Sequence, residues 1–277
     1  MLRMAAFADE ISPDIDEQIR VCRANGVTHI ELRGVAGKNV LDFDAALCSE
    51  IRSKLKAAGM GIAAIGSPIG KVKISEAFEP HLERFKKAVD LALLFESPFI
   101  RIFSFYAPAE GESTLPHRAE VMRRLGVFTG YVKDKNVVLV HENEHAIYGE
   151  MGKECLDIVK TINSPKLRNC FDFANYVVAG QYPPACWGAL KPYTTHIHIK
   201  DALFKDGTIT PAGKGDGHVG ELLADAYQSG YRGFLTLEPH LAHAGKLAGF
   251  SGPELFTVAV DALKGICREQ GIPLATV

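Results

Sequence analysis

Three carboxylates and one imidazole follow apolar runs in the second half of the chain, and together they have the composition of a metal site. Glu142 ends the run VVLVHE and Asp172 ends LRNCFD. His198 lies in THIHIKD, and Glu238 follows FLTL. Such runs are typical of buried strands, where a lone carboxylate is costly unless a cation or a donor neutralises it. Oxygen-rich ligands with one imidazole favour Mn²⁺, with Mg²⁺, Co²⁺ or Zn²⁺ as alternatives. The residues therefore predict a metal site.

The length and composition of the chain predict a single enzyme-sized domain. The chain has 277 residues, of which 47% are hydrophobic. This length is typical of an eight-unit α/β barrel, which commonly has about 250 residues. The formal net charge of −2 gives no general attraction to nucleic acid or to anionic membranes. No run approaches the about 18 apolar residues of a membrane span, and the N-terminus lacks a signal-peptide core.

The cysteines predict a reducing compartment. They are scattered along the chain without a CxxC pair, so they are expected to be small buried apolar residues rather than a disulfide framework. Together with the absence of a leader, this pattern predicts a cytoplasmic protein. The six positions are Cys22, Cys48, Cys155, Cys170, Cys186 and Cys267.

Short apolar runs alternate with helical stretches along the whole chain, which predicts repeated βα units. In the first unit, Ser12 is the expected N-cap of a helix that has Pro13 at its first position and ends before Gly26. The continuous apolar strands indicate a parallel sheet covered by helices, and eight units close into a single-domain (β/α)8 TIM barrel over residues 1–277. An open doubly wound sheet is the alternative. The expected strands are 4–8, 28–32, 61–66, 99–105 and the four runs above. One helix is expected to carry Leu47, Ile51 and Leu55 and to end at Gly59, the next to carry Phe78 to Leu93, and the later helices are 118–132, 153–162, 184–190, 221–229 and 253–267.

A barrel would bring the four candidate ligands together, because catalytic groups lie at the C-terminal ends of its strands. In THIHIKD, alternation places His196, His198 and Lys200 on one face, which is expected to point into the barrel. His198 is nearer the rim and is taken as the ligand, although the two histidines could exchange roles. Lys200 would either hold a substrate oxygen or pair with Asp201 or Glu238.

The motifs resemble those of a known family, the xylose isomerase-like TIM barrels. The resemblance rests on HEN, DFAN, HIHIKD and LEPH, with IELRG as weaker support, and it covers the whole chain. This family includes sugar and sugar-phosphate isomerases, ketose 3-epimerases and inosose dehydratases. The resemblance implies one divalent ion held by Glu142, Asp172, His198 and Glu238. It also implies that Glu142 and Glu238 transfer protons.

The implied chemistry acts on a hydroxy-ketone or hydroxy-aldehyde. A cation on the carbonyl oxygen and the neighbouring hydroxyl would stabilise an enediolate, so the α-proton could leave near neutral pH. If Glu142 and Glu238 act from opposite sides, the result is epimerisation. Return of the proton to the adjacent carbon gives isomerisation, and loss of a β-hydroxyl gives dehydration. The sequence thus predicts an isomerase or epimerase of a small keto-sugar or sugar phosphate. A lyase acting on a keto-cyclitol or dehydro-sugar is the alternative.

Several polar residues near the ligands are candidates for substrate binding. Asn175 follows Asp172 by three residues and could bond a substrate hydroxyl, although some ketose epimerases have a histidine there. Asn143 and His240 could support the ligands, contact substrate, or simply be solvated. Arg101 and Glu31, on the fourth and second expected strands, are expected to form a buried ion pair inside the barrel.

A glycine-rich segment, PAGKGDGH at 211–218, is the candidate phosphate cradle. A plain loop is the simpler interpretation of the same residues. Phosphorylation of the substrate therefore stays open, as does association of the chain into homo-oligomers.

Two other function classes are less consistent with the residues. A nuclease of the endonuclease IV type holds three zinc ions and needs more histidines, whereas this chain has Ser67 and Ser104 at the third and fourth strand ends. It also lacks the basic excess that phosphate contacts require. A barrel that had lost its chemistry would be expected to lack a ligand, yet all four are present. The expected partner is therefore a small sugar or sugar derivative, not nucleic acid or membrane.

Overall fold

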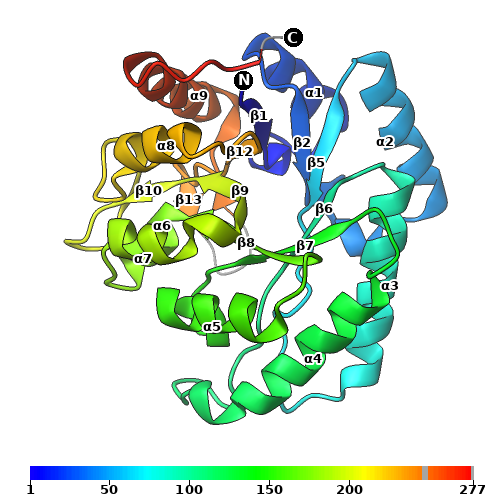
Figure 1. The fold of residues 1–277 in the computed structure, drawn as a ribbon. Coiled ribbons are helices and arrows are strands. Elements are labelled where there is room, and N and C mark those ends of the chain that lie inside the picture. Colours follow the sequence, from blue (N-terminus) through cyan, green and yellow to red (C-terminus); the bar gives the residue numbers. More distant parts are fainter. Residues whose placement is uncertain (245–248, 276–277) are drawn as a thin grey trace.

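Eight parallel strands close into a barrel in the computed structural model, which describes residues 1–244 and 249–275 (Figure 1). The prediction of a single-domain (β/α)8 TIM barrel is confirmed, and the open doubly wound alternative is wrong. The chain order is followed around the barrel from β2 to β9, and β12 closes it against β1. The barrel strands are β1 (Arg3–Ala6), β2 (His29–Leu32), β5 (Gly61–Ile65), β6 (Phe99–Ile102), β7 (Val138–Glu142), β8 (Leu167–Asp172), β9 (Thr194–Ile199) and β12 (Phe234–Leu237).

Helices surround the barrel and cover the outer faces of its strands (Figure 1). The predicted helices agree with the structure to within a few residues at each end. They are α1 (Ile15–Ala24), α2 (Ala45–Ala57), α3 (Phe78–Leu94), α4 (Arg118–Tyr131), α5 (Gly152–Ile162), α7 (Pro183–Leu190), α8 (Val219–Gln228) and α9 (Gly252–Glu269), and the short α6 (Phe173–Val178) was not predicted.

Shorter elements occupy the connections between these units. The two-residue strands are β3 (Gly34–Val35), β4 (Lys38–Asn39), β10 (Asp201–Ala202), β11 (Ile209–Thr210), β13 (His243–Ala244) and β14 (Gly249–Phe250). The 3-10 turns are η1 (Ala8–Glu10), η2 (Val40–Asp42), η3 (Leu115–His117), η4 (Tyr148–Glu150) and η5 (Lys191–Tyr193).

The first helix begins two residues later than the sequence predicts. Asp14, not Ser12, is its N-cap, because the Asp14 carboxylate accepts hydrogen bonds from the amides of Asp16 and Glu17 at 2.8 and 3.0 Å. Ser12 instead accepts a bond from the Asp14 amide at 3.1 Å. A charged carboxylate interacts more favourably with the positive end of the helix dipole than a hydroxyl does, which explains the outcome.

The strand register brings the candidate ligands to one rim. Asp172 lies opposite His198, and His198 lies opposite Thr236, so β8, β9 and β12 end at the same level. Inside the barrel, Glu31, His196 and Thr236 form a buried polar layer below that rim. The barrel interior is thus polar at its C-terminal end, where ligands and their supports are expected in this architecture.

Two predictions about the chain as a whole can be compared with the structure. All six cysteines are free and buried, as expected. Over the part of the chain that the structure describes, no helix combines the length and the apolar character that crossing a bilayer requires.

Candidate metal centre and active site

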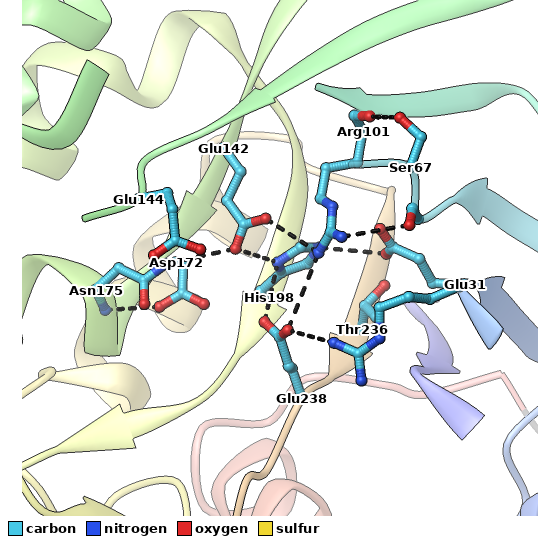
Figure 2. Close-up of polar contacts among 12 residues, drawn as sticks. Glu31, Ser67, Arg101, Glu142, Glu144, Asp172, Asn175, His198, Thr236 and Glu238 are labelled. Carbon is cyan, nitrogen blue, oxygen red and sulfur yellow. Dashed lines mark hydrogen bonds and ion pairs between the residues drawn. The ribbon is translucent and has the colours of Figure 1, made fainter. Parts of the chain in front are cut away.

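The four predicted ligands lie together at the C-terminal rim of the barrel (Figure 2). Glu142 is the last residue of β7 and Asp172 the last of β8, whereas Glu238 directly follows β12. One ligand atom from each of these residues and from His198 lies within 4.8 Å of the other three. The His198 Nδ1 atom is 3.0 Å from Glu142 Oε1 and 3.5 Å from Glu238 Oε2. The strand ends therefore assemble a compact set of three carboxylates and one imidazole.

The chemistry of this set fits a divalent cation. All four side chains are buried, with Asp172 and His198 fully inaccessible. Asp172 Oδ2 and Glu142 Oε2 are buried and accept no hydrogen bond. Buried carboxylate oxygens that accept no hydrogen bond need a positive charge nearby, and a metal ion is one of the few groups that can satisfy several of them at once. An oxygen-rich set with one imidazole suits Mn²⁺ or Mg²⁺.

Three cationic side chains surround the carboxylates. Lys200 Nζ lies 3.0 Å from Asp172 Oδ2 and 3.2 Å from Glu238 Oε2. Arg101 Nη1 is 3.3 Å from Glu142 Oε2, and Arg33 Nη1 is 3.1 Å from Glu238 Oε1. The predicted pair of Lys200 with Glu238 is confirmed, whereas Asp201 is not its partner. Each cation is itself buried, so these ion pairs are little screened by solvent.

Glu31 orients the imidazole of His198. Its Oε2 atom lies 3.2 Å from His198 Nε2 and 2.7 Å from His196 Nε2. If Nε2 donates its proton to Glu31, the Nδ1 atom of His198 keeps its lone pair directed at Glu142 and Glu238. This carboxylate–histidine arrangement is the usual support of a metal-binding imidazole. His196 packs below the rim and bonds Glu31 and Thr236, so of the two histidines only His198 belongs to the four-residue cluster.

The predicted ion pair between Arg101 and Glu31 does not form among the described residues. Arg101 turns to Glu142 and lies 4.0 Å from Glu238, whereas Glu31 binds the two histidines. The physical reason is that Glu31 and the two histidines are all fully buried, so each histidine needs a polar partner within the barrel.

Burial and the neighbouring charges shift the pKa values of the side chains in the centre. Burial raises the pKa of Asp172 to about 6, against the attraction of Lys200. Burial alone would also raise the pKa of Glu238, but Lys200, His198 and His240 hold it well below its ordinary value. Burial alone would lower the pKa of His198, yet the neighbouring Glu142 and Glu31 carboxylates contribute to raising it well above 6.5. Asp172 is thus the carboxylate of the centre with a raised pKa, whereas the surrounding positive charges lower the pKa of Glu238.

Two asparagines stabilise the strand ends that carry the ligands. The Asn143 amide is fully buried, and it donates to the Asp172 carbonyl and accepts from the Asp172 amide, both at 3.0 Å. Asn175 donates to the Asn143 carbonyl at 2.8 Å and lies 3.4 Å from Glu142 Oε1. Asp172 in turn caps α6 through the Asn175 amide. Asn143 therefore fixes the backbone of a ligand, and substrate contacts by either asparagine stay predictions.

His240 lies at the edge of the centre, behind Glu238. Its Nδ1 atom is 2.9 Å from Glu10 Oε1, and its backbone amide donates to Glu10 Oε2 at 2.8 Å. The Nε2 atom lies 3.9 Å from Glu238 Oε1. The φ angle of +49° places His240 in the left-handed region, which is unusual for a residue other than glycine. Its contact with substrate stays a prediction.

The glycine-rich segment is not a free phosphate cradle. The amides of Gly213, Gly215 and Gly217 all donate to the Asp201 carboxylate, at 2.9, 3.0 and 2.9 Å. A Cβ atom on Gly215 would lie 2.4 Å from the Ala202 carbonyl oxygen, so glycine is needed for this close approach. The Asp201 carboxylate therefore accepts the amide hydrogen bonds that a phosphate would need.

Three residues of the centre were not identified from the sequence as parts of it. Arg33 binds Glu238, Glu31 orients His198, and Glu10 binds His240. Arg33 and Glu31 belong to the IELRG motif on and after β2, where their spacing of two residues places them on one face. This two-residue spacing was the signal in the sequence from which both residues could have been assigned to the centre. Glu10 lies in a 3-10 turn after β1, and no pattern in the sequence connects it with His240.

The comparison with family models defines the class of protein. The model described as xylose isomerase-like TIM barrel matches residues 19–275. The chain belongs to the xylose isomerase-like TIM barrel family, as its motifs predicted. No curated protein sequence matches the chain significantly.

Solved structures share the fold along nearly the whole chain. The probable 3-DHS dehydratase of Bacillus anthracis is 17% identical with a TM-score of 0.75, over 95% of this chain and 99% of that chain. A D-allulose 3-epimerase of Methylomonas sp. in complex with D-allulose is 17% identical with a TM-score of 0.74, over 96% of each chain. A xylose isomerase-like protein of Mycobacterium smegmatis in complex with magnesium is 15% identical with a TM-score of 0.73, over 98% of each chain. At these low sequence identities, the structural similarity establishes a shared fold.

Proposed function

We propose that this protein is a divalent-metal-dependent isomerase or epimerase of a small keto-sugar or sugar derivative. The observation that carries the proposal is the convergence of Glu142, Asp172, His198 and Glu238, with their ligand atoms mutually within 4.8 Å at the C-terminal rim. This is the end of a TIM barrel at which catalysis takes place. Epimerase and dehydratase structures among the similar folds support a sugar or a dehydrated sugar derivative as the substrate.

The positions of the two glutamates support a role for both in proton transfer. A bound Mn²⁺ or Mg²⁺ ion would stabilise negative charge on the oxygens of the substrate. Glu142 comes from β7 and Glu238 from the end of β12, and His198 on β9 lies between them. One carboxylate can therefore remove a proton on one side of a substrate while the other returns it on the opposite side. Arg101 pairs with Glu142 and Arg33 with Glu238, which holds the two carboxylates in place.

Dehydration of a keto-cyclitol or dehydro-sugar is the second candidate, and the position of His240 favours it. Its Nε2 atom lies 3.9 Å from Glu238, and Glu10 fixes its ring from behind. An imidazole in this position can donate a proton to a leaving hydroxyl, which dehydration needs and epimerisation does not. The metal ligands would be the same for both reactions.

The experiment that tests the proposal is an NMR screen in D₂O with added Mn²⁺. Ketoses, ketose phosphates and inososes are incubated with the protein, and the same protein treated with EDTA is the control. Incorporation of deuterium next to the carbonyl without loss of water supports the isomerase or epimerase, and loss of water supports the dehydratase. Absence of both from all substrates, or cleavage of abasic DNA instead, would contradict the proposal.

A further inference from the structure

A cavity of about 880 Å³ lies at the end of the barrel opposite the metal centre. Its walls come from the first residues of β1, β2, β5 and β12 and from the C-terminal halves of α2 and α3. Strands rise about 3.3 Å per residue, so the barrel separates this cavity from the catalytic rim by roughly 15 Å. It is therefore distinct from the candidate active site.

Three cationic side chains line this cavity without acidic partners. Arg3, Arg52 and Lys56 are exposed, and none of them forms a hydrogen bond or an ion pair through its side chain within residues 1–244 and 249–275. Glu96 is the one acidic residue in the lining. Other cations at the surface, such as Lys54 and Arg118, have carboxylate partners at 2.8 and 2.7 Å. Three cations without such partners therefore line this one cavity.

The arrangement of α2 adds hydrogen-bond donors to the positive charge. Ser49, Arg52, Ser53 and Lys56 recur at spacings of three and four residues, so they share one face of the helix, and all four line the cavity. Arg3 reaches the cavity from β1, with its guanidinium 4.0 Å from the centre of the Phe234 ring. Guanidinium, ammonium and hydroxyl donors that converge from two elements are the groups that bind phosphate in proteins.

Stabilisation of the helix explains only part of this pattern. A lysine near the C-terminus of α2 interacts favourably with the helix dipole, which accounts for Lys56. It does not account for Arg3, which belongs to another element, or for the apolar floor that Met60, Phe95 and Phe234 form beside the cations. An apolar wall next to unpaired cations fits a ligand that has an anionic group and an apolar or flat part.

We propose that this cavity binds a small organic phosphate that carries a flat or apolar group. Its volume is within the range of pockets that hold small molecules. The phosphate would contact Arg3, Arg52 and Lys56, and the remainder of the ligand would lie against Met60 and Phe95. Binding there would be separate from turnover at the rim, and it does not depend on the function proposed above.

Calorimetric titration with AMP tests this site, with inorganic phosphate, citrate and adenosine as comparison ligands. All titrations contain EDTA, so that binding at the metal centre does not contribute. AMP is expected to bind with one-to-one stoichiometry and more tightly than inorganic phosphate or citrate, and adenosine is expected not to bind. The double variant Arg52→Ala/Lys56→Ala, and separately Arg3→Ala, should each weaken AMP binding by about tenfold or more, since a charge-assisted hydrogen bond contributes about 1.5–3 kcal/mol.

The matched control is Lys153→Ala/Lys160→Ala, which removes two exposed cations from α5, away from the cavity. It should leave AMP binding unchanged and so excludes an effect of net charge. Equal weakening by both double variants, equal binding of AMP and adenosine, or the absence of saturable binding at millimolar AMP would overturn the proposal. Thermal unfolding of each variant verifies that the fold is intact. A protein without sugar isomerase activity could still pass this test, so the two proposals fail separately.

Discussion

The two ends of the barrel differ in how their charges are compensated. At the C-terminal rim, Lys200, Arg33 and Arg101 are buried and each lies within 3.3 Å of a carboxylate oxygen of the metal centre. At the opposite end, Arg3, Arg52 and Lys56 are exposed and have no such partners. The rim is therefore organised to receive one more cation, whereas the opposite cavity is organised to receive an anion.

This difference in burial also determines how large the effects of substitutions and of salt should be at each end of the barrel. Charges at about 3 Å in a poorly solvated interior interact strongly and are little screened by salt. Exposed charges interact weakly and are screened at physiological ionic strength. Substitutions at the rim should therefore have large effects that salt hardly alters, and substitutions around the opposite cavity should have smaller effects that salt reduces.

The largest effect is expected for Glu142→Gln and Glu238→Gln. Each change keeps the size of the side chain but removes the base, so turnover should fall by about a hundredfold to ten-thousandfold. The melting temperature should fall as well, because each change removes a carboxylate partner of a buried cation, so the rates are compared at a temperature at which every variant is folded. Initial rates of deuterium incorporation measure the effect. Glu154→Gln, a change at a buried carboxylate on α5, is the control and should retain activity. Full activity in either rim variant would remove the distinction between the two ends.

The second prediction concerns Glu31, which supports the metal centre without belonging to it. Glu31→Gln should lower metal affinity by about ten- to a hundredfold, because the carboxylate that orients His198 is lost. Excess Mn²⁺ should restore activity. Calorimetric titration with Mn²⁺ measures the affinity directly. Thr236→Val is the matched control, because it removes a polar group that contacts His196 in the same layer but leaves the Glu31 carboxylate in place. Equal affinities in the two variants would show that Glu31 has no special role.

The third prediction concerns Lys200, whose ammonium group pairs with two of the carboxylates that would bind an ion. Lys200→Met leaves Asp172 and Glu238 without their shared ammonium, and breaking a buried ion pair in this way costs about 3–5 kcal/mol. The metal-free variant should thus melt at a lower temperature, and Mn²⁺ should raise its melting temperature more than that of the wild type. Lys71→Met, which removes a lysine paired with Glu144, is the control. Identical Mn²⁺-induced shifts would mean that Lys200 and the ion do not compete.

The fold and the ligands could be predicted because they depend on local patterns. Alternation of apolar runs with helical periodicity defines βα units, and a carboxylate at the end of such a run is conspicuous. Once eight units are recognised, the closed topology places Glu142, Asp172, His198 and Glu238 at one rim. The resemblance to the family then implied the roles proposed for them.

The supports of the centre could not be predicted because they depend on contacts between distant residues. Glu31 lies 165 residues from His196 in the sequence, and its choice of the histidines over Arg101 follows from how the side chains pack inside the barrel. Glu10 and His240 are 230 residues apart. The lining of the opposite cavity is similarly dispersed over β1, α2, α3 and β12, so only the spacing within α2 was visible in the sequence.

The smallest effect is expected at His29, which lines the opposite cavity beside Arg3. Burial, with a contribution from Arg3, lowers the pKa of His29 from 6.5 to about 4. The folded state therefore binds fewer protons than the unfolded state between these two pH values. The contribution of neutral His29 to stability is fully present above pH 6.5 and is lost as the pH falls through 4.

In His29→Gln, the melting temperature should accordingly fall less between pH 6.5 and pH 4 than in the wild type. The difference should be at most a few degrees, because His29 is only partly buried and solvent screens the charge it acquires. His145→Gln removes a histidine whose side chain is 78% exposed and should reproduce the wild-type slope. If the two variants have the same slope, Arg3 and burial do not keep His29 neutral. The opposite cavity would then gain a fourth positive charge in mild acid, and AMP binding there should strengthen as the pH falls.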